Sequence, residues 1–178
     1  MFNKKAVFLD RDGTLIEAVH RPDFHKTITA PFAYSELVFM PRAWETLQFL
    51  RTKGFMRIMI TNQPDVANGY MSESEWHRIH CEVIDTLRPD DFYMCRHVSD
   101  DNCPFKKPSH FMLMAAADKW GIDLSRSYMV GDTSADMDAG KAAGCKTVLI
   151  KTFYNTDTHG DFEIASLANL IELFKEIE

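Results

Sequence analysis

The sequence is poor in the features that mark several specialised protein classes. No apolar run approaches the ~18 residues of a membrane-spanning helix, and the apolar stretch from Ala6 to Leu9 is far too short for the core of a signal peptide. Glycine and proline number only 8 and 7 among 178 residues and no segment repeats, so collagenous and low-complexity chains are excluded. We therefore expect one cytoplasmic globular domain over residues 1–178.

Positive charge is scarce as well. The 20 lysines and arginines face 26 aspartates and glutamates, which gives a net charge of −6. A protein that holds a nucleic-acid backbone or an anionic membrane needs an excess of positive charge on the binding surface. We therefore expect neither nucleic acid nor a membrane as a partner, and we expect a monomer.

Cysteine is also sparse, with four residues that do not form the framework of a secreted, disulfide-bonded domain. In a reducing compartment such cysteines are core residues, metal ligands or reactive thiols. Only Cys95 and Cys103 lie close together in the sequence.

Short apolar runs alternate with helical patterns along the chain. Each run has the length of a strand and is apolar at successive positions, as strands covered on both faces are. Strands that alternate with helices form parallel sheets, because right-handed crossovers place helices on both faces. The pattern predicts an α/β fold with a doubly wound parallel sheet. The predicted strands are Ala6 to Leu9, Phe55 to Ile60, Phe92 to Cys95, Ser127 to Val130 and Thr147 to Ile150.

The predicted helices carry start and stop signals. Ser72 and Glu75 have the spacing of a capping box, with Met71 and Trp76 placed as its hydrophobic staple. The other predicted helices run from Pro41 to Gly54, from Ser109 to Gly121, from Thr133 to about Gly144 and from about Ser166 to Ile177.

Most residues directly after the predicted strands are polar or charged. In doubly wound sheets the ligand lies at the carboxyl ends of the strands. A single polar residue there is more often ordinary loop chemistry, because strand ends are exposed to water. Two aspartates and a threonine that converge with Lys107 indicate a site instead. The residues in question are Asp10, Asp12, Thr61, Asn62, His97, Asp132 and Lys151.

The segment Asp10-Arg11-Asp12-Gly13-Thr14 is the strongest local signal. Its two carboxylates, where an apolar strand gives way to a turn, point into one cavity and repel each other unless a cation or a shared proton lies between them. Mg²⁺ suits oxygen ligands and bridges carboxylate to phosphate. We expect Mg²⁺ here rather than the alternative, a helix-capping aspartate in a solvated turn.

The stretch from Phe8 to Leu15 resembles the first motif of the haloacid dehalogenase superfamily of phosphatases. Thr61, Lys107 and Asp132 with Asp136 resemble the three later motifs, in order, so the resemblance covers the whole chain. Thr61-Asn62-Gln63 and Cys95-Arg96-His97 are similar to the subgroup of heptose-1,7-bisphosphate and histidinol-phosphate phosphatases. The resemblance implies a Rossmann-like fold with a minimal cap domain or none.

The resemblance also implies catalytic roles for four residues. Asp10 would attack the phosphate, and Asp12 would protonate the leaving alcohol and later deprotonate water. Thr61 would bind a phosphate oxygen, and the Lys107 ammonium would offset the negative charge around it.

The implied magnesium ligands are a carboxylate oxygen of Asp10, the main chain at Asp12 and the carboxylate of Asp132. Asp136 would support the metal through water or a hydrogen bond. An equally good interpretation makes Asp136 a residue of the first helical turn, where a carboxylate favours the helix dipole.

In the subgroup a loop before the catalytic lysine holds a structural zinc ion. Cys95, His97 and Cys103 match three of its ligands, but Phe105 stands at the fourth position. Three ligands do not complete the tetrahedral site that structural zinc prefers. Either Asp100 or Asp101 replaces the missing ligand or the loop has lost its metal, and we favour the loss.

Other departures from the subgroup concern the substrate. Asn68, Lys106 and Thr133 stand where the heptose enzymes carry Arg, Arg and Lys, and Asp65 stands in the same region. Each change removes or weakens a cation that would bind phosphate, so we expect a second phosphate to be poorly held unless the segment after the first motif compensates. The candidate substrate-binding residues are Asn62, Lys106, Arg21 and His20, with His25 and Lys26 in the same segment as Arg21.

These features predict a Mg²⁺-dependent phosphomonoesterase of carbohydrate metabolism that forms an aspartyl-phosphate. Its expected partner is a small phosphorylated metabolite, a heptose bisphosphate or a related sugar phosphate. Histidinol phosphate and a nucleic-acid 3′-phosphate are rival substrates. A phospho-accepting signalling domain and a silent binding module are rival classes. Asp12, placed to activate water, favours turnover over a long-lived phospho-aspartate.

Overall fold

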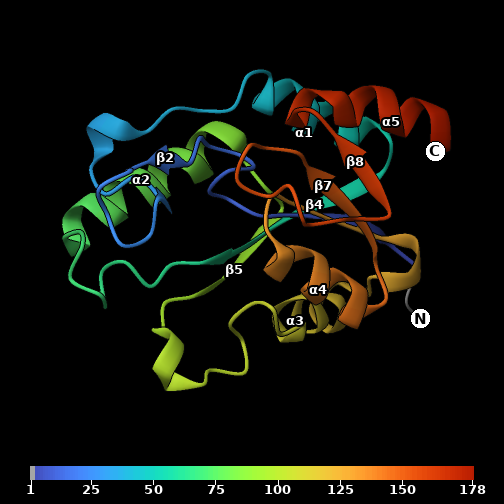
Figure 1. The fold of residues 1–178 in the computed structure, drawn as a ribbon. Helices are drawn as coiled ribbons and strands as arrows, with labels where there is room; N and C mark the ends of the chain where they lie inside the picture. Colours follow the sequence, from blue (N-terminus) through green and yellow to red (C-terminus); the bar gives the residue numbers. More distant parts are fainter. Residues whose placement is uncertain (1–2) are drawn as a thin grey trace.

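The protein, seen in a computed structural model that describes residues 3–178, is built on a six-stranded parallel sheet (Figure 1). Strand order across the sheet is β5-β4-β1-β6-β7-β8, so the first strand lies inside it. The strands are β1 (Lys5–Leu9), β4 (Phe55–Asn62), β5 (Asp91–Cys95), β6 (Tyr128–Gly131), β7 (Lys146–Ile150) and β8 (Phe162–Ile164). The predicted doubly wound parallel sheet is confirmed.

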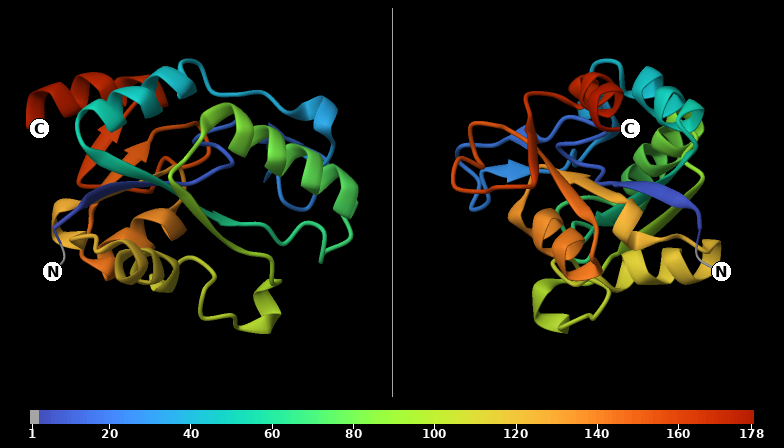
Figure 2. Two further views of the ribbon diagram at one scale, coloured as in Figure 1. Left: turned by 180° about the vertical axis from the view of Figure 1, so that it is seen from behind. Right: turned by 90° about the vertical axis from the view of Figure 1, so that its right-hand side faces the viewer.

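Two helical layers cover the sheet (Figures 1 and 2). One layer holds α1 (Ala43–Thr52), α2 (Glu73–Leu87) and α5 (Leu170–Ile177), and the other holds α3 (Phe111–Trp120) and α4 (Ser134–Ala143). Strand β1 shows why the strands are apolar at successive positions. Val7 and Leu9 belong to the core beneath the first layer, whereas Ala6 and Phe8 belong to the core beneath the second.

Two elements were not predicted. The edge strand β8 has only three residues with Glu163 in the middle, which gives no apolar run. A two-stranded antiparallel ribbon, β2 (Val19–His20) and β3 (Ile28–Thr29), lies between β1 and α1. No large cap domain is built on this segment. The predicted domain of residues 1–178 includes Met1 and Phe2, which lie outside the described residues.

The helix signals mostly act as predicted. Thr133 caps α4 and Asp136 closes the capping box, while Gly144 ends the helix in the left-handed conformation. Ser72 accepts the backbone N–H of Glu75, but the Glu75 carboxylate accepts the backbone N–H of Tyr34 instead of closing the predicted capping box. The Glu75 side chain therefore makes a tertiary contact instead of capping its own helix.

The helices of the described chain include none that combines the length and the apolar character needed to cross a membrane.

Candidate active site

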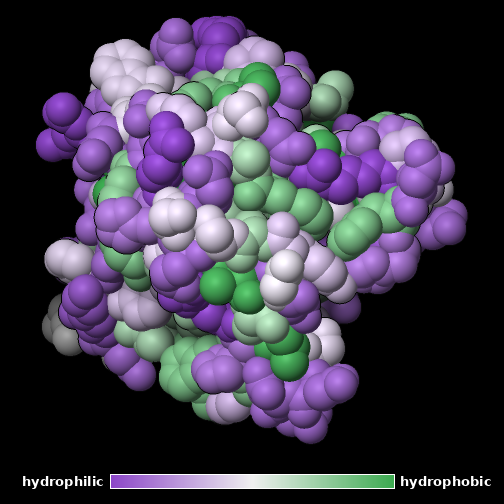
Figure 3. Space-filling view, turned by 90° about the vertical axis from the view of Figure 1, so that its left-hand side faces the viewer, coloured by the Kyte–Doolittle hydropathy of each residue, from purple (hydrophilic) through white to green (hydrophobic). Residues whose placement is uncertain are grey.

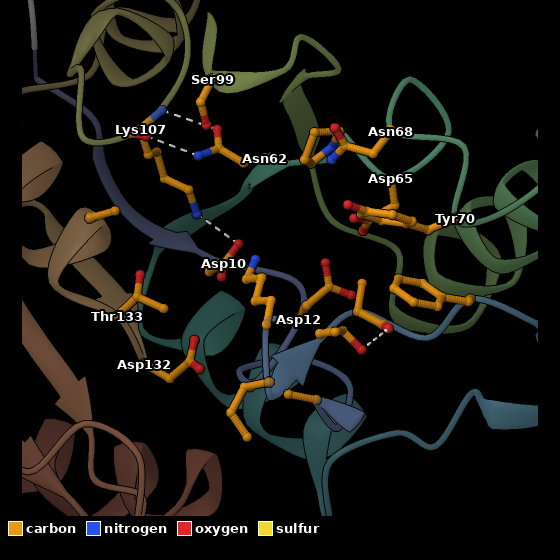
Figure 4. Close-up of a pocket in the computed structure, with 18 of the residues that line it drawn as sticks. Asp10, Asp12, Asn62, Asp65, Asn68, Tyr70, Ser99, Lys107, Asp132 and Thr133 are labelled. Carbon is orange, nitrogen blue, oxygen red and sulfur yellow. Dashed lines mark hydrogen bonds and ion pairs between the residues drawn. The ribbon is translucent and has the colours of Figure 1, made fainter. Parts of the chain in front are cut away.

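A cavity of about 510 Å³ lies at the carboxyl ends of the strands, in the size range of small-molecule sites. Figure 3 views the molecule from the left of Figure 1, and hydrophobic residues gather near the middle of that face with hydrophilic residues around them. Asp10 follows β1, Asp132 follows β6, and Lys107 comes from the loop between β5 and α3; all three line the cavity (Figure 4). The sheet therefore brings together three residues that are far apart in sequence.

Lys107 is the buried cation at the centre of the site. Its Nζ lies 2.7 Å from Oδ1 of Asp10 and 2.6 Å from Oδ1 of Asp136, and it donates to the carbonyl oxygen of Ile60 at 2.9 Å. Burial alone would lower the pKa of Lys107, but the two carboxylates hold it above its usual value. The side chain therefore stays charged while it is shielded from water.

Asp132 carries a proton more readily than an exposed aspartate. Burial, and then the neighbouring Asp136, raise the pKa of Asp132 to about 7. Its Oδ2 accepts a hydrogen bond from the Tyr154 hydroxyl at 2.6 Å. Burial likewise raises the pKa of Asp10 well above its usual value, against the opposing effect of Lys107. The site holds more negative charge than its own cation offsets.

The donor atoms fit a hard divalent cation. Carboxylate oxygens of Asp10, Asp132 and Asp136 all lie within 4.8 Å of one another, and each of these residues is buried. Within residues 3–178 no donor reaches the buried Oδ1 of Asp132. An oxygen-only set with one atom left without a partner is what Mg²⁺ binds. We assign this cluster as the candidate magnesium site.

Asp136 is a residue of the first helical turn, as one of its two predicted interpretations has it, and it also contacts Lys107. Its Oδ2 accepts from the Thr133 backbone and hydroxyl, at 3.0 and 2.5 Å, as a first-turn helix residue does. Its Oδ1 accepts from Lys107, which ties the start of α4 to the site. A Cβ on Gly131 would collide with the Asp136 carboxylate, and a Cβ on Gly13 with that of Asp132, so these acids pack directly against backbone.

Asp12 also lines the cavity, and two neighbours hold its carboxylate. Arg11 donates from Nε at 3.0 Å and from Nη2 at 2.8 Å, and the Gln63 amide donates at 2.5 Å. Arg11 is fully buried, whereas the Asp12 side chain keeps 15% of its surface exposed. The carboxylate is fixed in orientation and still open to the cavity.

Thr61 and Asn62, at the end of β4, support the site differently from prediction. Thr61 is fully buried and does not line the cavity; its hydroxyl accepts from Gln63 at 2.9 Å. Asn62 lines the cavity, but its amide makes two 3.0 Å hydrogen bonds with the main chain of Lys107, one as donor and one as acceptor. Asn62 thus holds the catalytic loop against the sheet.

Cys95, His97 and Cys103 also come together. Their ligand atoms lie within 4.8 Å of one another, and Cys95 Sγ is 3.6 Å from His97 Nδ1. Phe105, at the position of the missing ligand, is 45% exposed. Lys106 lines the cavity and donates to the carbonyl oxygen of His97 at 2.8 Å, which gives the loop a tie that needs no metal.

Two predicted substrate residues do not reach the cavity. Arg21 pairs with Glu36 and donates to Thr29 at 3.0 Å, and its guanidinium lies 4.3 Å from the centre of the Phe32 ring. His20 packs against Phe153 at 5.4 Å between ring centres. Neither residue lines the cavity, whereas their neighbours His25 and Lys26 do.

Several supporting residues were not predicted. Tyr154 holds Asp132, and the Asn155 amide donates to the main-chain oxygen of Asp132 at 2.7 Å. Both belong to the loop after β7, where no periodic pattern or motif marks them. Arg11 and Gln63 belong to sequence motifs described above. Their contacts with Asp12 could not be predicted, because these contacts depend on how β1 and β4 pair.

Comparisons with known proteins agree with this geometry. A family model described as "HAD-hyrolase-like" matches residues 104–168. The D-glycero-beta-D-manno-heptose-1,7-bisphosphate 7-phosphatase of Pasteurella multocida is 34% identical over 195 aligned positions, which cover 98% of this chain and 99% of that protein. The chain belongs to the haloacid dehalogenase-like hydrolase family.

Further matches extend this result. The enzyme of the same name from Haemophilus ducreyi is 33% identical over 189 positions, covering 94% of this chain and 97% of that protein. The D,D-heptose 1,7-bisphosphate phosphatase of B. bronchiseptica, solved with magnesium and phosphate, shares the fold with a TM-score of 0.82 at 24% identity, over 98% of this chain and 99% of that one. As a HAD-like hydrolase with relatives named phosphatases, the protein is an enzyme of that class.

Replacing Lys107 by methionine should destabilise the metal-free protein. The change leaves Asp10 and Asp136 buried without their cation, and breaking a buried ion pair in this way costs about 3 kcal/mol. Urea denaturation in the presence of a chelator at pH 8 measures the loss.

The matched control is Lys175→Met. This change removes an exposed ion pair to Glu172, 3.0 Å long, and should cost under about 1 kcal/mol. Equal, small losses for both variants would contradict the role given to the buried ammonium.

Proposed function

We propose that this HAD-like hydrolase is a Mg²⁺-dependent phosphatase that hydrolyses a sugar phosphate through an aspartyl-phosphate. The observation that carries the proposal is the buried, unpartnered Oδ1 of Asp132 in a cavity that it shares with Asp10 and Lys107. A sugar phosphate is the substrate class because the relatives are named for a heptose bisphosphate.

In the first half-reaction Asp10 acts as the nucleophile. Lys107 pairs with Oδ1 of Asp10 and leaves Oδ2 to form a bond to phosphorus while the ester P–O bond breaks. The leaving oxygen takes a proton from the carboxyl group of Asp12. Thr61 does not line the cavity and its hydroxyl accepts from Gln63, so we assign it no contact with the phosphate.

In the second half-reaction Asp12, now a carboxylate, takes a proton from water. The water oxygen bonds to phosphorus, the bond to Asp10 breaks, and inorganic phosphate leaves with the Asp10 carboxylate restored. Arg11 and Gln63 keep Asp12 aimed at the same point in both steps, because neither contact depends on the substrate.

Magnesium would be held by Asp10, Asp132 and the main chain at Asp12, with Asp136 beside them. When bound, Mg²⁺ supplies positive charge that offsets the repulsion between a carboxylate nucleophile and a phosphate dianion. Tyr154 and Asn155 fix Asp132 from the far side, so that its free oxygen faces the other two carboxylates.

Asp10→Asn should abolish turnover and leave the fold intact, because a carboxamide of the same size is a poor nucleophile. Phosphate release from a panel of phosphate esters measures turnover, and circular dichroism with thermal melting checks the fold. Activity near wild type in the purified variant would rule out the proposed nucleophile.

Asp12→Asn separates the two half-reactions. An activated aryl phosphate needs no acid to expel its leaving group, so the variant should still become phosphorylated but should hydrolyse the intermediate slowly. Mass spectrometry after acid quench detects the covalent phosphate. The absence of any accumulated phospho-enzyme would remove Asp12 as the base.

Metal removal should distinguish the two metal clusters. Chelation of Mg²⁺ should eliminate activity, and added Mg²⁺ should restore it. Removal of zinc should not unfold the protein, because the core is large and the Cys95, His97 and Cys103 set lacks its fourth subgroup ligand. Elemental analysis and melting with and without chelator provide the measurement. One tightly held zinc ion per chain, with melting on chelation, would show that another residue completes the site.

A further inference from the structure

The cavity continues past the catalytic cluster to a wall of aromatic rings. We define the aromatic wall as Phe24, Phe32 and Tyr70, which line the same cavity as Asp10. Tyr70 lies on the opposite side of Asp12 from Lys107, next to Asp65 (Figure 4). A substrate whose phosphate lies on Asp10 can therefore place the rest of the molecule against this wall.

The aromatic wall is preformed. The centre of the Tyr70 ring lies 5.0 Å from that of Phe24 and 5.6 Å from that of Phe32, and Phe24 and Phe32 lie 5.7 Å apart. The Tyr70 hydroxyl also hydrogen-bonds to Nε2 of His25 at 3.1 Å. Rings that support one another at these distances are held in place, so a ligand meets a ready surface.

Tyr70 nonetheless keeps 37% of its surface exposed. The exposed part lies in a cavity, where aromatic rings supply contact area for the flat, apolar face of a ligand ring. Phe24 and Phe32 do not cover this part of the Tyr70 ring, so a ligand ring can contact it.

Asp65 stands beside Tyr70 and lines the cavity, and it is half-buried. Its carboxylate makes no hydrogen bond or ion pair with any group in residues 3–178. Burial, and then the charge of Asp12, raise the pKa of Asp65 above its usual value. Such a carboxylate is stabilised by a ligand that donates an N–H or O–H hydrogen bond.

A second phosphate would meet poor partners here. A dianion gains nothing from an aromatic face and is repelled by a carboxylate, whereas phosphate sites are built from arginine forks and backbone N–H groups. Lys26 lines the cavity and is exposed, and Lys106 is engaged with the carbonyl of His97.

We propose that Asp65 and Tyr70 are specificity-determining residues that bind the leaving alcohol, with the face of its ring on Tyr70 and a donor on its edge to Asp65. The substrate is therefore a phosphate ester of a ring-containing alcohol with N–H or O–H donors, and a second phosphate brings no advantage. Both a sugar ring and a cationic imidazole ring have this chemistry. The proposal rests on the phosphatase function proposed above.

Steady-state kinetics of the Mg²⁺-loaded enzyme tests the subsite with four esters. Heptose 7-phosphate and histidinol phosphate carry rings with donors, heptose 1,7-bisphosphate adds a phosphate, and glycerol 3-phosphate is an acyclic reference. For each ring ester we compare kcat/KM with that of the reference, so that effects on the catalytic centre cancel.

Tyr70→Ala should lower this ratio at least about tenfold for the preferred ring ester, as expected for one lost stacking contact. Asp65→Asn should lower it as much for an ester with a cationic donor, as expected for one lost charge-assisted hydrogen bond, and less for a sugar ester. A larger loss for histidinol phosphate in Asp65→Asn identifies a cationic donor, because an amide still accepts from a sugar hydroxyl. Heptose 1,7-bisphosphate and heptose 7-phosphate should differ by less than about threefold in wild type.

Control variants lie outside the cavity. Asp85→Asn removes an exposed carboxylate from α2, and Trp44→Ala removes a ring that is 51% exposed on α1. Both should leave the ratio unchanged. The proposal would be overturned if both Asp65→Asn and Tyr70→Ala kept the ratio within twofold of wild type. A hundredfold preference for the bisphosphate would also overturn it and would point to Lys26 and His25 as phosphate ligands.

A binding arm keeps this test separate from the proposed activity. In the Asp10→Asn background, calorimetry with Mg²⁺ measures the Kd of each intact ester, with and without the Asp65→Asn change. If Asp65→Asn raises the Kd of the ring esters but not that of glycerol 3-phosphate, the subsite is supported even if no ester is hydrolysed. If the wild-type enzyme hydrolyses every ester and the Asp65→Asn change leaves every Kd unchanged, the phosphatase function stands and the proposed subsite is overturned.

Discussion

The site depends on one buried positive charge. Lys107 is buried between Asp10 and Asp136, and its ammonium is what permits two carboxylates to be buried at this distance. With Asp132 the cluster has three carboxylates, and one ammonium cannot offset their charge. Together with burial, this excess of negative charge raises the pKa values of Asp132 and Asp10. The cluster thus has a deficit of positive charge, which the magnesium ion proposed above would offset together with the Lys107 ammonium.

The sheet topology makes this cluster from distant pieces. Because β1 lies between β4 and β6, the ends of three neighbouring strands present Asp10, Thr61 and Asp132 within one small region. The helix that follows β6 adds a charge at its first turn, because Asp136 is held at the start of α4. Glycine at positions 13 and 131 lets carboxylates approach backbone where a Cβ would collide.

Sequence patterns predicted the parts of this arrangement that are local. Alternation of apolar runs and helices was enough to place Asp10 and Asp132 at one edge of the sheet, whereas Lys107 was identified from its resemblance to a family motif. Arg21 could not be placed in this way, because its position depends on Glu36 across a turn of the segment before α1. Tyr154 lies in an irregular loop 22 residues from its partner Asp132, and only the folded chain shows that contact. The strand β8 was too short and too polar in its middle residue to be recognised.

Two hydrogen bonds between the Asn62 amide and the Lys107 main chain attach the long connection from β5 to α3 to the sheet at one point. They divide the connection into a part at Lys107 and a part before it. The part that carries the Lys107 ammonium is attached to the end of β4 by these bonds. The part from Arg96 to Phe105, which contains His97 and Cys103, lies outside that attachment. A substitution in the outer part, for example at Phe105, should therefore leave the position of the Lys107 ammonium unchanged.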